Sequence, residues 1–213
     1  MHRRTVCSLL IAGCIATAGL DRAFAITPLP LECADQRVYL VLAAPGALFL
    51  VDDAPTLPAR FVDVVSLRRS GGNPWKIIGV WDAFSPLGVE CTLTALGDLS
   101  VWLGLRNSDD QGTRFDVKAE LLVDGAVMAS GVTSCVAGVT RNPLKAKEVT
   151  VAFDPFPPVL FDGVIHDVAL RISARIGTPT PGTCGGHASA TGLRLYYDGA
   201  TRPAGFDMQL VPN

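Results

Sequence analysis

Apolar residues recur at every second position over several stretches of this chain. In the stretch FDVKAELLV, residues 115–123, a hydrophobic side chain alternates with a charged or second apolar one. Similar alternation covers 99–105, 168–176 and 193–197. A period of two that is sustained over five positions is typical of a strand with one buried face. One-sided burial favours antiparallel sheets, because the strands of parallel sheets are buried on both faces.

Turn-forming dipeptides separate these stretches. Asp124-Gly125 lies between 115–123 and 126–132 and predicts a two-residue hairpin. Asp198-Gly199 is interpreted as a second hairpin turn, between the strands expected at 193–197 and 206–211. No segment carries a helical period over three turns, and 144–148 has room for one helical turn at most.

The resulting prediction is an all-β chain of about ten or eleven short strands. We expect residues 26–213 to form a single antiparallel β-sandwich of two sheets, jelly-roll or immunoglobulin-like. A closed barrel is the alternative architecture.

The N-terminal residues 1–25 have the organisation of a secretory signal peptide. Arg3 and Arg4 precede an uncharged stretch, 5–20, and Ala23-Phe24-Ala25 supplies a small–x–small cleavage pattern. The uncharged stretch is short for a membrane span, which needs about 20 apolar residues, and no later apolar run is longer. The sequence therefore predicts an exported protein, periplasmic or extracellular, without a transmembrane span.

Two other interpretations of the leader remain open. Ala16-Thr17-Ala18 is an earlier candidate cleavage site. Ile11-Ala12-Gly13-Cys14 fits a bacterial lipobox, which would leave the protein anchored through a lipid on Cys14. Residues 15–16 continue the apolar stretch instead of turning polar, so cleavage near Ala25 is favoured.

Four cysteines follow the leader: Cys33, Cys91, Cys135 and Cys184. An even number in an oxidising compartment indicates disulfides, and no pair has the close spacing of a zinc site. Four cysteines allow three connectivities. We favour Cys33–Cys91 with Cys135–Cys184, because each bond would then staple one half of the chain.

Charge and motif content argue against several function classes. Without the three arginines and one aspartate of the leader, the net charge is about −4, which argues against binding to a nucleic-acid backbone. No Gly-x-Ser-x-Gly elbow is present, and only His166 and His187 remain as candidate bases. We therefore predict no enzymatic activity and no catalytic residue.

One acidic loop offers several oxygen ligands. It contains Asp109 and Asp110 within 107–110, and Asp116 follows closely. Calcium takes six to eight oxygens, often from such loops, so these three aspartates are candidate calcium ligands. The alternative is a polar connection whose side chains bond their own backbone, and the spacing is not that of an EF-hand. No other cofactor is predicted.

Two aromatic residues stand out of phase with the buried positions around them. Trp102 shares its phase with Ser100 and Gly104, and Tyr196 shares its phase with Arg194 and Asp198. Outward-facing aromatic rings can stack on sugars, which makes Trp102 and Tyr196 candidate ligand-binding residues. The alternative is that both rings fill the edges of the core.

Several stretches resemble a module that recurs in exported bacterial proteins, a domain of unknown function. The resemblance covers about residues 60–210 and implies a β-sandwich in an extracellular setting, with no catalytic residues. It rests on SGGNPW (70–75), VWLGLRNSDD (101–110), GTRFDVKAE (112–120), CVAGVTRNP (135–143) and ATGLRLYYDGATRPAGF (190–206).

These observations together favour a non-enzymatic binding or structural module that meets an extracellular ligand, with glycans among the candidates. A carbohydrate-binding module that uses Trp102 and Tyr196 is the first alternative. A secreted hydrolase with an unlocated carboxylate pair is the second.

Overall fold

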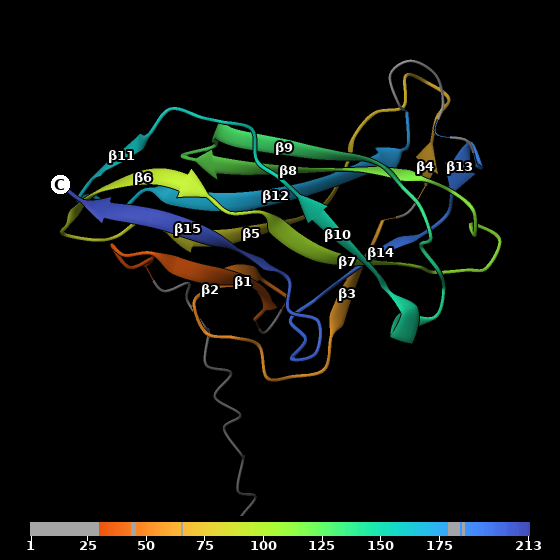
Figure 1. Cartoon of the computed structure of the whole chain (residues 1–213), viewed down its shortest axis with the longest axis horizontal. Helices are drawn as coiled ribbons and strands as arrows, with labels where there is room; N and C mark the ends of the chain where they lie inside the picture. The colour runs from red at the N-terminus through yellow and green to blue at the C-terminus, as the bar shows by residue number, and fades with distance from the viewer. Residues whose placement is uncertain (1–29, 44–45, 65, 179–183, 185) are drawn as a thin grey trace, which may run out of the picture.

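The computed structural model describes residues 30–213 except 44–45, 65, 179–183 and 185. The predicted leader, with Cys14 and the candidate cleavage sites, lies outside the described residues. Strands account for nearly all regular structure, as Figure 1 shows. One short 3-10 helix, η1 (Pro143–Lys145), falls where the sequence allowed a single helical turn.

The strands are β1 (Gln36–Leu42), β2 (Leu48–Val51), β3 (Arg60–Val64), β4 (Leu67–Arg68), β5 (Lys76–Phe84), β6 (Glu90–Leu96), β7 (Leu99–Leu105), β8 (Phe115–Val123), β9 (Ala126–Val136), β10 (Lys147–Val151), β11 (Val159–Asp162), β12 (Asp167–Ile176), β13 (Ser189–Ala190), β14 (Leu193–Tyr197) and β15 (Gly205–Pro212).

Hydrogen bonding links most strands into one continuous path, β3-β14-β7-β15-β1-β2-β5-β12-β8-β9. β10 adds to the edge of β7, and β6 joins β15 to β11, while β4 and β13 form a small sheet of their own. All of these strand pairs are antiparallel except β2 with β5. The predicted all-β class is confirmed, and the predominantly antiparallel pairing agrees with the alternating sequence pattern.

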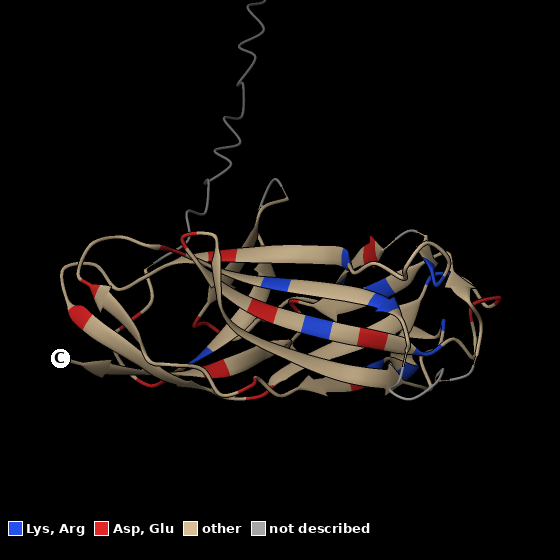
Figure 2. Cartoon of the chain, turned by 90° about the horizontal axis from the view of Figure 1, so that it is seen from above, with Lys and Arg blue, Asp and Glu red and all other residues tan. Residues whose placement is uncertain are grey.

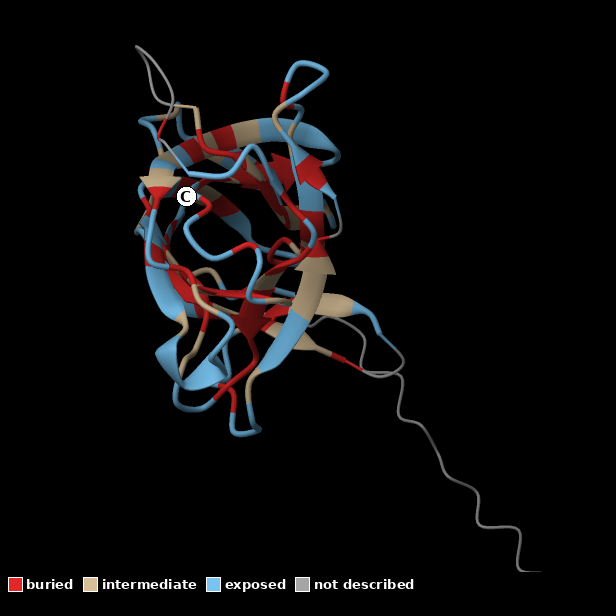
Figure 3. Ribbon diagram, turned by 90° about the vertical axis from the view of Figure 1, so that its right-hand side faces the viewer, coloured by how far each residue is buried: buried red, intermediate tan, exposed pale blue. Residues whose placement is uncertain are grey.

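The strands fold into two layers around a buried interior, which Figure 3 shows end-on. Trp81 of β5 meets Tyr197 of β14 edge to face, with ring centroids 5.2 Å apart. Both side chains are almost fully buried, as are the odd-numbered residues of β7. Alternation along the strands therefore does place their apolar side chains in the core.

The Asp124-Gly125 hairpin is confirmed. β8 ends at Val123 and β9 begins at Ala126, and the two strands pair directly. The φ angles of Asp124 and Gly125 are +48° and +78°, and two consecutive positive φ values are what a type I′ turn needs.

The second predicted hairpin is wrong. β14 pairs with β3 and β7, whereas β15 pairs with β1, β6 and β7. Asp198 has a φ of +57°, and its carboxylate accepts a hydrogen bond from the Leu42 amide at 3.3 Å. The Asp-Gly pair thus turns the chain toward β1 instead of back along β14.

Two disulfides join the four cysteines in the predicted pairs. Cys33 bonds Cys91 of β6, and Cys135 of β9 bonds Cys184 in the segment before β13. Each bond closes a loop of about 50–60 residues and constrains the unfolded chain. Among the residues described, no helix has the length and hydropathy to cross a membrane.

Candidate functional site

Three aromatic side chains lie in line across the outer face of β3, β14 and β7. Tyr196 is the register partner of Trp102 on one side and of Phe61 on the other. Its neighbour Tyr197 points into the core, where burial raises the pKa of the phenol to about 12. Because side chains alternate across a strand, Tyr196 must then face outward. We call Trp102, Tyr196 and Phe61 the aromatic row.

The members of the row differ in exposure. Phe61 is 49% exposed and meets Tyr196 edge to face, with ring centroids 6.2 Å apart. Tyr196 is only 5% exposed, and its ring lies over Gly104 so closely that a Cβ there would be 2.5 Å from the ring carbon Cε2. Trp102 is partly exposed. The glycine therefore lets the middle ring lie close to the sheet.

Two arginines lie against the outer rings. The Arg202 guanidinium carbon is 5.7 Å from the centre of the Trp102 ring, and that of Arg194 is 4.6 Å from the centre of the Phe61 ring. Arg194 also donates to Asp63 at 3.2 Å, which holds it in place. Cations that stack on aromatic faces gain about 0.5–1 kcal/mol at exposed sites. Each of the two outer rings of the row thus has a cation against its face.

The polar atoms of the Trp102 and Tyr196 rings have no hydrogen-bond partner within the described structure. These atoms are Trp102 Nε1 and Tyr196 OH, and both are covered. A buried donor without an acceptor costs about 1–3 kcal/mol, so native proteins contain few of them. Two neighbouring donors without acceptors mark the row as a place where an acceptor would be favourable.

An open hollow of about 530 Å³ lies beside the row. It is lined by Gln111 and by residues of 140–145, including Arg141 and Lys145. Arg202 connects the two features, since it lies over Trp102 and donates to the Leu144 carbonyl at 2.8 Å. Thr140 accepts from the Leu105 amide at 2.9 Å, which fixes the rim of the hollow against β7.

The three candidate calcium ligands, Asp109, Asp110 and Asp116, have different surroundings and different hydrogen-bond partners. Asp109 is exposed. Asp110 is buried, and its Oδ2 accepts from the Thr191 amide at 2.9 Å, the Thr191 hydroxyl at 3.1 Å and the Gly192 amide at 3.3 Å. These bonds tie the 107–110 loop to the start of β14. They account for Asp110 without a metal, and calcium binding stays a prediction.

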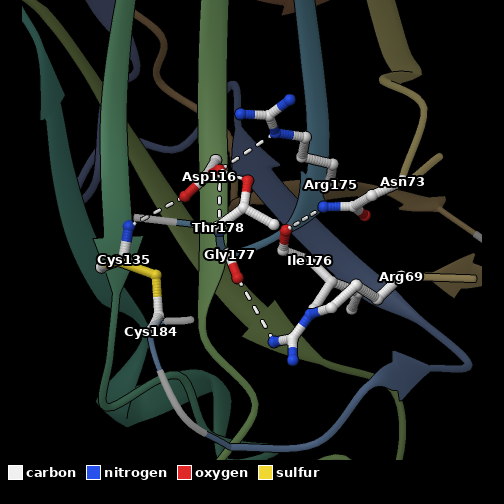
Figure 4. The surroundings of a disulfide bond; sticks show 9 residues. All are labelled: Arg69, Asn73, Asp116, Cys135, Arg175, Ile176, Gly177, Thr178 and Cys184. Atoms are coloured by element: carbon white, nitrogen blue, oxygen red, sulfur yellow. Dashed lines mark hydrogen bonds and ion pairs between the residues drawn. A yellow bond between two sulfur atoms is a disulfide. The ribbon is translucent and has the colours of Figure 1, made fainter. Parts of the chain in front are cut away.

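Asp116 is engaged elsewhere, beside the Cys135–Cys184 disulfide (Figure 4). Its fully buried carboxylate accepts from the Cys135 amide and Arg175 Nε, both at 3.0 Å, and from the amide and hydroxyl of Thr178, both at 3.1 Å. Asp116 and the two cysteines form one compact group of candidate metal ligands among the described residues. The cysteines are disulfide-bonded, so they offer no thiolate to a metal.

Sequence reasoning found two members of the row and missed the third. Trp102 and Tyr196 stood out because each breaks the phase of a long alternating strand. Phe61 lies in the short stretch RFVDV, which shows no comparable alternation, and only the pairing of β3 with β14 brings it to Tyr196. The Pro143–Lys145 hollow was also missed, because it depends on contacts between distant loops.

His166 forms a separate charged cluster at the opposite end of the sandwich. Its Nδ1 lies 2.7 Å from Asp124 Oδ2 and its Nε2 lies 3.0 Å from Asp162 Oδ1. Hydrogen bonds to Asp124 and Asp162 raise the pKa of His166, and the same contacts lower the pKa of both carboxyls. The Ser85 hydroxyl accepts from the His166 amide, so it contacts the backbone and not the ring. The cluster therefore fastens loops together and lacks a nucleophile–base pair.

No protein-family model and no curated protein matches the chain. Solved structures do resemble it in fold. An aminopeptidase from a marine sediment thaumarchaeon matches with a TM-score of 0.54 and 10% identity, over 83% of this chain and 37% of that one. An α-amino acid ester hydrolase matches with a TM-score of 0.50 and 11% identity, over 83% of this chain and 36% of that one. The chain thus spans little more than a third of each, and at such identity the likeness shows a shared all-β fold.

Proposed function

We propose that this protein is an exported, non-enzymatic binding module that holds a glycan against its aromatic row. The observation that carries the proposal is the alignment of Trp102, Tyr196 and Phe61 on neighbouring strands of one outer face. The apolar faces of sugar rings stack on such side chains. Backbone pairing fixes the spacing of the three rings, so the row is preorganised for an extended chain of sugars.

The unpaired donors of the row support this proposal. Sugar hydroxyls and ring oxygens are acceptors that could satisfy Trp102 Nε1 and Tyr196 OH. Both atoms are covered in the free protein, and Arg202 lies over the tryptophan. Displacement of this single flexible side chain would open the indole to a ligand, and the guanidinium could then donate to the same sugar.

Export is supported by the disulfides and by the leader. Structural disulfides persist in oxidising compartments, and both observed bonds join parts of the chain that are far apart in sequence. The leader 1–25 supplies the matching signal in the sequence.

Glycan binding can be tested with a panel of immobilised oligosaccharides and calorimetry on the strongest of them. We expect Trp102→Ala and Phe61→Ala each to weaken binding about tenfold, as the loss of one stacking partner should. Leu160→Ala is the matched control, because Leu160 is 59% exposed but lies on β11, away from the row.

Thermal melts of the three variants would verify that each remains folded. Glycan binding that is unchanged in both row variants would refute the assignment of the row. Release of shortened sugars from a bound oligosaccharide would refute the non-enzymatic part of the proposal.

A further inference from the structure

Basic residues are unevenly distributed along the long axis of the molecule. Most arginines and lysines lie toward the end away from the C terminus, whereas acidic residues lie along the whole length (Figure 2). At the C-terminal end the strand register brings several acids together: Glu90 pairs with Asp162, and Asp167 lies at the start of β12 beside the Asp124 turn. The small net charge of the chain does not reveal this uneven distribution of charged residues.

The basic end contains cations that have no acidic partner. Seven ion pairs occur among the described residues, and they use other cations. The exposed cations that remain outside these pairs at this end include Arg68, Lys76, Arg106, Arg114, Arg141, Lys145 and Lys147. Asp109 and Glu148 are the exposed acids in the same region. The excess of positive charge is therefore free to attract an anion.

The basic end and the aromatic row adjoin. Arg141 and Lys145 line the 530 Å³ hollow, and Leu144 between them accepts the hydrogen bond from Arg202, which covers Trp102. Arg106 follows Leu105, whose amide bonds the hollow's Thr140. Arg202 thus links the Trp102 end of the row to a hollow lined by Arg141 and Lys145, neither of which forms an ion pair among the described residues. On the side of Trp102 away from Tyr196, its register partner on β10 is the exposed acid Glu148.

From this arrangement we infer that the ligand is an acidic polysaccharide, which stacks sugar rings on Trp102 and Phe61 and places a carboxylate between Arg141 and Lys145. The inference rests on the proposed glycan function and names the class of glycan. Stacking alone would suit a neutral chain, and charge alone would suit any polyanion. A polymer of uronic acids meets both features at once.

The test compares two forms of one polymer: polygalacturonate oligosaccharides, and the same oligosaccharides after reduction of their carboxyl groups to alcohols. We expect the native form to bind at least tenfold more tightly than the reduced form at low salt, and to lose affinity as salt rises. Arg141→Gln and Lys145→Gln should each weaken binding of the native form about tenfold, and should leave binding of the reduced form unchanged.

Arg37→Gln is the matched control, because it removes the same charge outside the hollow, where Arg37 is paired with Asp207. It should leave the binding of both forms unchanged. An equal effect of Arg37→Gln and Arg141→Gln would show that only net charge matters, and would overturn the inference.

Other outcomes separate the inference from the proposed function. Equal binding of native and reduced forms, with loss in Trp102→Ala, would overturn the acidic-ligand inference and support a glycan module. Equal binding of single-stranded DNA and polygalacturonate, unchanged in Trp102→Ala, would indicate a general polyanion surface and overturn both. Absence of binding to either form and to the neutral panel would also overturn both.

Discussion

The carboxylate of Asp116 shows how a single buried charge can organise several parts of a β protein. It accepts hydrogen bonds from β9, from β12 and from Thr178, which follows β12. The Cys135 amide is one of the donors, and Cys135 has a φ of +60°, a conformation that costs energy for a residue other than glycine. The carboxylate thus helps to hold the disulfide-bearing residue in a strained backbone.

Replacement of this carboxylate should be costly. In Asp116→Asn the amide nitrogen cannot accept a hydrogen bond. The donors to that position, either the Cys135 amide or Arg175 and Thr178, therefore lose their acceptor. We expect the free energy of unfolding to fall by about 3 kcal/mol, as measured by urea denaturation with the disulfides intact. Asp109→Asn is the control, because Asp109 is exposed, and it should change stability by less than about 0.5 kcal/mol. Similar losses in the two variants would contradict the role given to Asp116.

The His166 cluster makes stability depend on pH in a defined window. Hydrogen bonds to Asp124 and Asp162 raise the pKa of His166 above 6.5, so its contribution is complete below pH 6.5 and is lost as pH rises through the raised value. The pKa of each partner carboxyl is lowered from 3.8, so their contribution is complete above pH 3.8 and is lost as pH falls. The cluster therefore stabilises the fold most between about pH 4 and 6.5.

We expect the melting temperature of the wild type to fall between pH 5.5 and 8.5, and to fall less in His166→Gln. Thermal melts monitored by circular dichroism at matched ionic strength would measure both slopes. His187→Gln provides the comparison, since His187 lies outside the His166 cluster and its Nε2 is 2.9 Å from the Gln111 carbonyl. A wild-type slope that persists fully in His166→Gln would assign the pH dependence to other groups.

At the residue scale, sequence periodicity predicted well which face of a strand a side chain lies on, but predicted poorly whether that side chain is buried. It placed Trp102 and Tyr196 on the outer face, where they lie. It also gave Asp116 and Glu120 an outward phase, yet both are buried. Arg171 and Lys118 flank Glu120 from β12 and β8, and cover it in ion pairs at 2.9 Å and 2.8 Å. Lys118 lies two residues from Glu120 on the same strand, but the cross-strand partner Arg171 depends on register between distant segments, which a single sequence does not reveal.

β9 and the chain just after β10 approach each other closely at a glycine. Gly131 of β9 lies against Ala152 just after β10, and a Cβ at Gly131 would be 2.0 Å from the Ala152 carbonyl oxygen. Nearby, the Asp154 amide donates to the Ser130 carbonyl at 2.7 Å. The glycine therefore lets the chain after β10 pass over the β9 edge and brings the two layers together on that side.

Gly131→Ala should separate these elements. We expect a loss of about 2 kcal/mol in unfolding free energy, because the obstructing atom is backbone and cannot rotate away. In this variant, hydrogen exchange should speed up in β9 and β10 relative to the wild type, and it should speed up more there than in β5. Val132→Ala is the neighbouring control, since Val132 is 48% exposed. An unchanged unfolding midpoint in Gly131→Ala would show that the chain after β10 shifts freely.

At the element scale, the two Asp-Gly turns show when a dipeptide is sufficient to predict a hairpin and when it is not. The Asp124-Gly125 turn joins strands that pair with each other, so local turn chemistry determines the hairpin. The Asp198-Gly199 pair has similar local chemistry, but β14 is already occupied by β3 and β7 on its two edges. Its outcome is determined by long-range pairing, which the dipeptide cannot encode.

At the scale of the whole molecule, the two disulfides and the distribution of charge were unequally predictable. The sequence left three cysteine pairings open, and the favoured one, in which each bond links one half of the chain, is the pairing observed. The uneven distribution of charged residues could not be predicted, because the net charge does not say where in the fold each charged residue lies. The candidate site was equally hard to predict from the sequence. Its cations come from loops around residues 106, 141 and 145, which are brought together only in the folded chain.

Each disulfide should contribute to the stability of the whole chain. Replacement of Cys135 and Cys184 together by serine, or of Cys33 and Cys91 together, should lower the unfolding free energy by about 2–5 kcal/mol. Urea denaturation of each double variant, with the other bond kept oxidised, measures the two losses separately. Treatment of the wild type with a reductant should reproduce them together, and an unaltered midpoint after complete reduction would contradict the expectation.

The position of β15 also has a consequence for the order of events during synthesis. This last strand pairs with β1, the first, and with β6 and β7 from the middle of the chain. A ribosome makes the chain from the N terminus, so β1 cannot pair with β15 until that strand has been made. Hairpins such as β8–β9 can form early, but the sandwich is complete only once β15 has been added.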